Sequence, residues 1–213
     1  MMAWLIDLCL HLDRHLVEIL ATYHLWIYPI LFTVIFAETG FVVTPFLPGD
    51  SLLFAVGALA AVDTSGTLTA PRASLALALA AVLGNTVNYA IGRAIGPPAF
   101  SGRYRLLKVE YLRRTEAFFL RHGGLAIFLS RFMPIIRTCA PFVAGIGRMP
   151  FARFLAWNLA GGCCWVLLFI WGGYLFGNIP LVKQHFGLVT IAIIVASLVP
   201  LASALWRRGT PLR

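Results

Sequence analysis

The chain alternates long apolar runs with short polar or proline-rich interruptions, a pattern typical of a helical membrane protein. The long runs occupy residues 25–43, 73–96, 151–177 and 187–206. A helix needs about 20 apolar residues to cross a bilayer. The pattern therefore predicts an all-α integral membrane protein with about four full spans, in a single membrane domain over residues 23–206.

Two amphipathic segments and a basic tail accompany these runs. In residues 1–22, charged and histidine side chains fall on one helical face and leucines on the other, which predicts a helix lying in the membrane interface. The same residues lack the pattern of a cleavable signal peptide. Residues 103–121 hold six basic and two acidic side chains and predict a second interfacial helix, at the cytoplasmic leaflet. Residues 207–213 form a basic tail that we expect in the cytoplasm.

The first interrupted segment, at about residues 38–62, places two acids and two prolines in an apolar run. Proline breaks a helix, and an acid at membrane depth costs roughly 2.5–3.5 kcal/mol on insertion scales. Broken backbone is tolerated in a bilayer only where it is buried in protein or lines a cavity. We therefore predict a re-entrant hairpin that carries the acids toward a hydrated cavity; a proline-kinked span with one acid at each interface is the alternative. The residues concerned are the acids Glu38 and Asp50 and the helix-breaking Pro45, Pro48 and Gly49.

The second interrupted segment, at about residues 124–148, combines prolines with positive charges. Arginine stays protonated in ordinary environments, so Arg131 and Arg137 must be paired, hydrated or bound to an anion. Backbone N–H groups freed at the proline breaks could join them in an anion site. The alternative is that both side chains reach lipid phosphates from an interfacial loop. We predict a second re-entrant hairpin, with Pro134, Pro141 and Gly145 as its structural break residues.

In the helix predicted at residues 73–96, nearly every fourth residue is small, which lets another backbone approach closely. These positions are Ala76, Ala80, Gly84, Asn88, Gly92 and Gly96. Polar side chains in this helix and in the second interrupted segment either pack between helices or line a polar cavity. The candidates are Asn85, Asn88, Tyr89 and Ser130.

Composition and charge limit the classes of protein to which this chain can belong. Of the 213 residues, 60% are hydrophobic and 12% are charged, and the mean hydropathy is +0.87, which is too apolar for a soluble domain of this size. The formal net charge of +9 fits basic loops on the cytoplasmic side and predicts that both termini lie there. The basic residues are spread among spans and loops, so we expect no nucleic-acid partner. The cysteines lack metal-ligand spacing, and His11 and His15 are spaced for a shared metal but have no third ligand at a suitable spacing. We therefore expect no disulfide, metal or cofactor.

Each half of the chain holds an interrupted charged segment followed by a glycine-rich helix. This layout predicts an inverted-repeat helical bundle with its site near the bilayer midplane. The acids of one half and the arginines of the other would then share one site. Burial favours the protonated carboxyl group and pairing with arginine favours the carboxylate, and the sequence leaves both states open. It also leaves the oligomeric state open, with a homo-oligomer among the states allowed.

Four ordered motifs follow one another along the chain. They are Phe36-x-Glu38, Pro45-x-x-Pro48-Gly49-Asp50, Gly84-Asn85-x-x-x-Tyr89-x-x-Gly92-Arg93 and Ser130-Arg131-Phe132-x-Pro134-x-x-Arg137-x-x-x-Pro141-x-x-Ala144-Gly145. Together they resemble the signature of the DedA family of bacterial membrane proteins, which contain the VTT domain. The resemblance extends over residues 30–177 and maps the family's two membrane-embedded acids to Glu38 and Asp50, and its two essential arginines to Arg131 and Arg137.

The resemblance implies a lipid transporter of the bacterial inner membrane, driven by the proton-motive force, and not an enzyme. The expected substrate is undecaprenyl phosphate or another anionic phospholipid, with its phosphate on the arginines and protons on the acids. Phospholipid scrambling and proton-coupled export of small solutes, including cation antiport, are the alternatives. A lipid phosphatase would need a nucleophile and base at a spacing that the histidines do not offer. A scaffold without transport activity is a further alternative.

Overall fold

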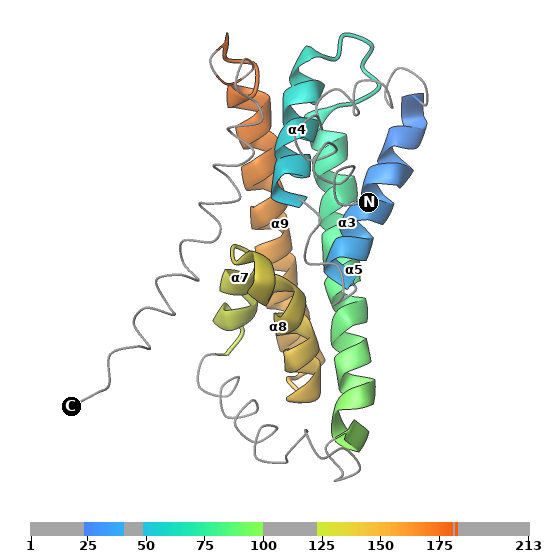
Figure 1. Ribbon diagram of the computed structural model, residues 1–213, viewed down its shortest axis with the longest axis vertical. Helices are drawn as coiled ribbons and strands as arrows, with labels where there is room; N and C mark the ends of the chain where they lie inside the picture. The colour runs from blue at the N-terminus through green and yellow to red at the C-terminus, as the bar shows by residue number, and fades with distance from the viewer. Residues whose placement is uncertain (1–23, 41–48, 100–122, 181, 183–213) are drawn as a thin grey trace, which may run out of the picture. The chain divides into compact units, whose positions relative to one another are not determined.

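The computed structural model describes residues 24–40, 49–99, 123–180 and 182, and over these residues all regular elements are helices (Figure 1). They are η1 (His24–Trp26), α3 (Ile27–Gly40), α4 (Gly49–Val62), α5 (Ala70–Ala99), α7 (Leu125–Ser130), α8 (Pro134–Ile146) and α9 (Phe151–Phe176). The predicted all-α class is therefore confirmed for the described part of the chain.

The contacts between residues divide the chain into two compact units. One unit contains α4 and the other contains α7 and α8, whereas α3, α5 and α9 contribute residues to both. In described residues, the first unit comprises 24–31, 49–77, 166–180 and 182, and the second comprises 32–40, 78–99 and 123–165.

Two of the described helices are long and apolar enough to cross a bilayer, at Ala70–Ile95 and Phe151–Phe176. At 1.5 Å per residue, the 26 residues of each extend about 39 Å, more than the hydrocarbon core of roughly 30 Å. The spans predicted at residues 73–96 and 151–177 are thus present as helices. The span predicted at 187–206 lies outside the described residues, as do the interfacial helices and the basic tail.

α5 is longer at both ends than the sequence prediction. Pro71 lies in the first turn of the helix, where its missing N–H group costs no hydrogen bond. At the other end, the helix continues through Pro97 and Pro98 to Ala99. Each of these prolines lacks the N–H group that would donate to the carbonyl group four residues earlier, and the helix ends one residue after Pro98.

The first interrupted segment contains two separate helices. α3 ends at Gly40 and α4 begins at Gly49, so the apolar run is divided as predicted. Pro45 and Pro48 lie outside the described residues, and Gly49 is the first residue of α4. That these two helices form a re-entrant hairpin stays a prediction.

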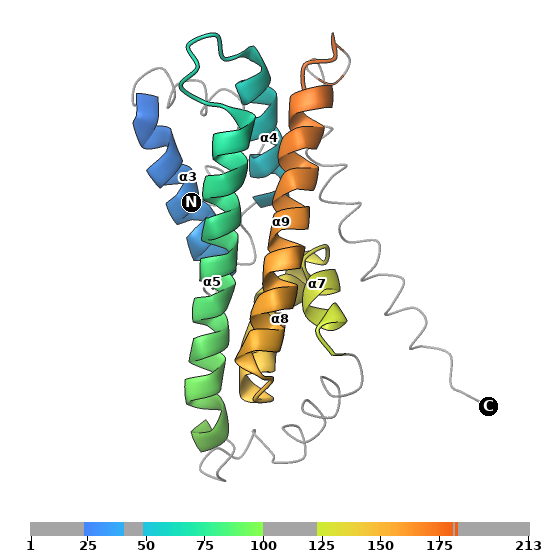
Figure 2. The ribbon, with the colours of Figure 1, turned by 180° about the vertical axis from the view of Figure 1, so that it is seen from behind.

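The second interruption is a short turn between α7 and α8, which pack against each other in both views (Figures 1 and 2). Arg131 and Phe132 donate backbone bonds of 3.2 Å to carbonyl groups three residues earlier, which tightens the end of α7. Met133 then adopts an extended conformation, with φ −123° and ψ 102°. The residue before a proline is restricted to this region, and Pro134 opens α8. Pro134 is therefore the residue that breaks the helix.

Pro141 and Gly145 do not interrupt the helix, which corrects the sequence prediction. α8 runs through both residues to Ile146. An internal proline removes one backbone bond and kinks a helix without always ending it. Gly145 instead allows a close contact, because a Cβ atom there would collide with the Tyr89 carbonyl group of α5.

In the first unit, α4 crosses the end of α9 at two glycines. A Cβ atom on Gly57 would collide with the carbonyl group of Ile170. One on Gly173 would collide with the carbonyl group of Phe54. The two backbones therefore touch, as small residues allow, and α4 runs beside this end of α9 in both ribbon views (Figures 1 and 2).

In the second unit, α8 crosses the end of α5 by the same arrangement. Gly145 meets the Tyr89 carbonyl group, and a Cβ atom on Gly92 would collide with the carbonyl group of Phe142. In all four contacts of the two units, the carbonyl group belongs to the residue three positions before a contacting glycine. The repeated contact supports an internal repeat; the inverted relation of the two halves stays a prediction.

Candidate functional site

Four charged side chains are buried among the described residues. They are Glu38, Asp50, Arg131 and Arg137, with exposed fractions of 0%, 8%, 1% and 5%. They are also the four that stand out in the sequence. Because a buried charge is costly unless it is paired or hydrogen-bonded, their surroundings define the candidate site. The alternatives that put these charges at a water-exposed interface do not fit this burial.

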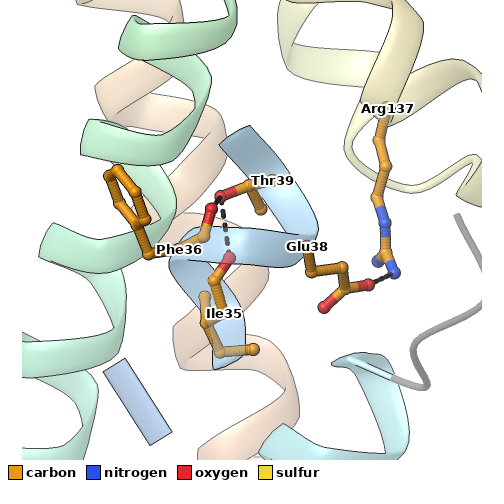
Figure 3. A network of polar contacts seen from close by, with 5 residues as sticks. All are labelled: Ile35, Phe36, Glu38, Thr39 and Arg137. Atoms are coloured by element: carbon orange, nitrogen blue, oxygen red, sulfur yellow. Dashed lines mark hydrogen bonds and ion pairs between the residues drawn. The ribbon is translucent and has the colours of Figure 1, made fainter. Parts of the chain in front are cut away.

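Glu38 and Arg137 form a buried ion pair between the last turn of α3 and the first turn of α8 (Figure 3). A carboxylate at the end of a helix and a cation at the start of one both oppose the helix dipole. Each side chain therefore compensates the unfavourable position of the other. The structure brings together two groups that are 99 residues apart in the sequence.

α3 reaches this position because α5 has no side chain at Gly84. A Cβ atom there would collide with the Thr39 hydroxyl oxygen, and it would lie 2.8 Å from the Phe36 carbonyl oxygen. Thr39 turns its hydroxyl group back to the Ile35 carbonyl oxygen, at 2.8 Å (Figure 3). The glycine row predicted for the helix thus places the end of α3, and Glu38 with it, against α5.

Asn88 of α5 connects the two helices that carry the ion pair. Its amide nitrogen donates to the Thr39 carbonyl oxygen at 3.3 Å and to the Thr138 carbonyl oxygen at 2.7 Å. These residues follow Glu38 and Arg137 directly in the sequence. Asn88 therefore fixes α3 and α8 to the same side of α5, next to the pair.

Arg131 is surrounded by neutral oxygen atoms. Its Nη2 atom donates to the Ala81 carbonyl oxygen at 2.9 Å and to Asn158 Oδ1 at 2.8 Å. The Asn85 amide nitrogen donates to the same Asn158 Oδ1 atom at 3.0 Å. In the described part of the chain, no carboxylate lies within ion-pair distance of this guanidinium group.

Trp165 of α9 lies against both guanidinium groups. Its ring centroid is 5.9 Å from the guanidinium carbon of Arg131 and 5.1 Å from that of Arg137. An indole face attracts cations at this range. The second unit therefore contains one polar cluster with two positive charges and one negative charge, held by α3, α5, α8, α9 and the turn after α7.

Asn158 and Trp165 were not predicted from the sequence. Asn158 is fully buried, and its amide nitrogen donates to the Val82 carbonyl oxygen at 3.0 Å. The available signal was a single amide in the apolar run of residues 151–177. Tryptophan gives no comparable signal, because it is common in membrane helices.

Tyr89 and Ser130 bind protein oxygen atoms. The Tyr89 hydroxyl group donates to the Met149 carbonyl oxygen at 2.5 Å and accepts from Arg93 at 3.0 Å, and its ring stacks on Phe154. The Ser130 hydroxyl group donates to the Ile127 carbonyl oxygen at 2.7 Å. These contacts show that both side chains pack against the protein itself. That they also line a cavity stays a prediction.

Asp50 belongs to the other unit, in the first turn of α4. The partial positive charge of a helix N-terminus stabilises a carboxylate in that position. Both predicted acids are thus buried, but at opposite ends of their helices.

Comparisons with known proteins decide the family. Residues 47–175 match the VTT domain. Over 198 residues, the chain is 48% identical to Protein DedA of Escherichia coli strain K12, with 92% of this chain and 90% of that protein covered. The chain belongs to the DedA family.

Two further relatives come from the same E. coli strain. The chain is 36% identical over 183 residues to Inner membrane protein YghB, covering 85% of this chain and 79% of that protein. It is 33% identical over 190 residues to Inner membrane protein YqjA, covering 85% of each. These DedA-family names support an inner-membrane location. No solved structure matches the chain.

Proposed function

We propose that this DedA-family protein moves an anionic lipid across the inner membrane, driven by protons. The observation that carries the proposal is the buried cluster of Glu38, Arg131 and Arg137, in which positive charge exceeds negative charge. Stability alone gives no reason to bury two arginines, because a protein whose buried ion pair is replaced by apolar residues is often equally stable or more stable. A ligand with a negative charge gives such a reason.

The sign of the cluster selects the class of substrate. Two guanidinium groups repel a cation, and the repulsion is strong in a low-dielectric interior. They fit a phosphate group, because guanidinium donors match its oxygen atoms in pairs. Among membrane components, undecaprenyl phosphate and anionic phospholipids carry such a group on an apolar tail.

The ion pair supplies a way to couple the lipid to protons. When a phosphate group binds Arg137, Glu38 loses its ion pair with Arg137, and its buried carboxylate becomes more costly. Uptake of a proton removes that charge. Release of the proton on the other side would restore the pair and expel the lipid. Asp50 serves as a second proton acceptor in this proposal.

The driving force is of a suitable size. Moving one charge through 100 mV supplies roughly 2.3 kcal/mol, which changes an equilibrium by more than a factor of about ten. Scrambling of phospholipids without proton coupling remains the nearest alternative. Export of a small solute with the same acids is a further one, and the arginines disfavour its cation-antiport form.

The test is lipid flipping in liposomes that contain the purified protein and a fluorescent anionic lipid. We expect the double variant Arg131→Ala with Arg137→Ala to lose transport. The matched control, Arg148→Ala with Arg153→Ala, removes the same charge from two exposed positions of the same unit and is expected to transport normally.

Normal flipping by the first double variant would overturn the proposal. Flipping that is lost in that variant but is unaffected by a proton gradient would favour the scramblase. Proton flux that follows an added solute in vesicles without anionic lipid would favour the exporter.

A further inference from the structure

We infer that Asn158 is a positioning residue that holds Arg131 without neutralising it, so that Arg131 offers a permanent positive charge to a lipid phosphate. The inference rests on the proposed function and assigns different tasks to the two arginines. Arg131 binds the phosphate group for as long as the lipid occupies the site, whereas Arg137 binds it only when the ion pair with Glu38 is broken.

The orientation of Asn158 is fixed from α5. Its amide nitrogen donates to the Val82 carbonyl oxygen at 3.0 Å and to the Thr86 hydroxyl oxygen at 3.4 Å. An amide held by its nitrogen in this way must present its oxygen on the other side. That oxygen accepts from Arg131 Nη2 at 2.8 Å, and both side chains are almost completely buried.

The choice of an amide determines the charge of the cluster. A carboxylate of almost the same shape would bind the guanidinium group more strongly, through a charge-assisted bond. It would also place a second negative charge, besides that of Glu38, beside the two arginines of this unit. An amide oxygen supplies the hydrogen bond and leaves the positive charge uncompensated. The Ala81 carbonyl group contributes a neutral oxygen atom in the same way.

The contrast with Arg137 supports this division. Arg137 meets the Glu38 carboxylate, whereas the acceptors of Arg131 among the described residues are neutral oxygen atoms. Both guanidinium groups lie against the same indole ring of Trp165, so they belong to one cluster. A phosphate group that reaches the cluster therefore meets one arginine that is already charge-compensated and one that is not.

The experiment compares Asn158→Asp with Asn158→Ser in the purified full-length protein in detergent. Binding of fluorescent phosphatidic acid and of fluorescent diacylglycerol is measured by anisotropy, because these lipids differ only in the phosphate group. We expect Asn158→Asp to weaken phosphatidic acid binding at least about tenfold, to the level of Arg131→Gln. Diacylglycerol binding and the thermal midpoint of unfolding should not fall.

Asn158→Ser keeps a neutral oxygen atom at this position, and we expect it to bind phosphatidic acid within about threefold of the unaltered protein. A defect of packing alone would instead affect both lipids and both variants. In an Arg131→Gln background, Asn158→Asp should have no further effect, because the charge on which it acts is gone.

Unchanged phosphatidic acid binding by Asn158→Asp would overturn the inference, as would equal losses in Asn158→Asp and Asn158→Ser. If Asn158→Asp yields no folded protein, Asn85→Asp places a carboxylate beside the same guanidinium group and carries the same expectation. If the unaltered protein does not prefer phosphatidic acid to diacylglycerol, the proposed function itself fails. The two failures are therefore distinguishable.

Discussion

Arg131 and Arg137 are only six residues apart in the sequence, yet one binds neutral acceptors and the other binds a charged one. Arg131 contacts neutral oxygen atoms from α5 and α9, and Arg137 contacts the Glu38 carboxylate from α3. The difference arises because the break at Pro134 redirects the chain between them, so that each side chain leaves from a differently oriented backbone. At the scale of single residues, one short segment therefore produces two electrostatic environments.

The buried pair makes a prediction about stability. Replacement of Arg137 by Ala leaves Glu38 buried without its partner, so we expect the free energy of unfolding in detergent to fall by about 3–5 kcal/mol. The double variant Glu38→Gln with Arg137→Gln removes both charges and should lose less. Arg148→Ala, at an exposed position, is the control and should change little. Equal losses in the single and double variants would contradict the paired description.

The charged residues of the site could be predicted, and most of their partners could not. Glu38, Asp50, Arg131 and Arg137 stand out because charges are rare in apolar runs. The pairing of Glu38 with Arg137 is not encoded locally, since it depends on how α3 and α8 both dock on α5. Asn158 was missed for a similar reason: an amide in a span becomes informative only when its acceptors and donors are known.

At the scale of helices, a proline or glycine in the sequence does not always mark a helix break. Pro134 breaks the helix because the residue before it must be extended, a restriction that can be read from the sequence. Pro141 lies within α8, and a proline at that position can be accommodated by the loss of one bond. Gly145 resembles a break residue in the sequence but is a contact residue in the structure. Sequence alone does not distinguish these cases, because the distinction lies in the neighbouring helix.

The glycine contact in the first unit makes a second prediction, with a control in the adjacent residue. A Cβ atom at Gly173 would collide with the Phe54 carbonyl group, whereas one at Gly172 has no atom within 4 Å. We expect Gly173→Ala to lower the free energy of unfolding by roughly 1–3 kcal/mol, as other overpacked sites do. Gly172→Ala should raise it by about 0.5–1 kcal/mol, because alanine favours the helix. Similar effects of the two substitutions in thermal unfolding would argue against the α4–α9 contact.

At the scale of the whole molecule, an apolar helical protein of the DedA family contains one polar cluster in which α3, α5, α8 and α9 all take part. The class and the spans at α5 and α9 could be predicted, since they follow from run length and composition. The division into two units could not, because α3, α5 and α9 each continue from one unit into the other. Apolar periodicity is uninterrupted where they do so.

The proposed coupling makes a third prediction for the intact protein. Glu38→Gln cannot release or take up a proton at this position, so the response of the lipid flipping rate to an imposed pH gradient should fall, with Asp50 left as the remaining proton acceptor. In the unaltered protein, a protonophore should reduce the initial rate at least about tenfold, in line with the driving force of one proton per 100 mV. The measurement is the initial flipping rate in liposomes at a series of gradients. An equal response in the variant and the unaltered protein would exclude Glu38 as the coupling group.

The two glycine contacts of α5 in the second unit fix the spacing along α5 between α3 and α8. This spacing can be checked in homologous sequences. Gly84 contacts the end of α3, and Gly92, eight residues later in α5, contacts α8. Adding or deleting one residue between them would rotate one contact by about 100° around the axis of α5 relative to the other. The acid and the arginine that these helices carry would then no longer meet. A relative with a different length in this interval should therefore lack one or both partners of the pair.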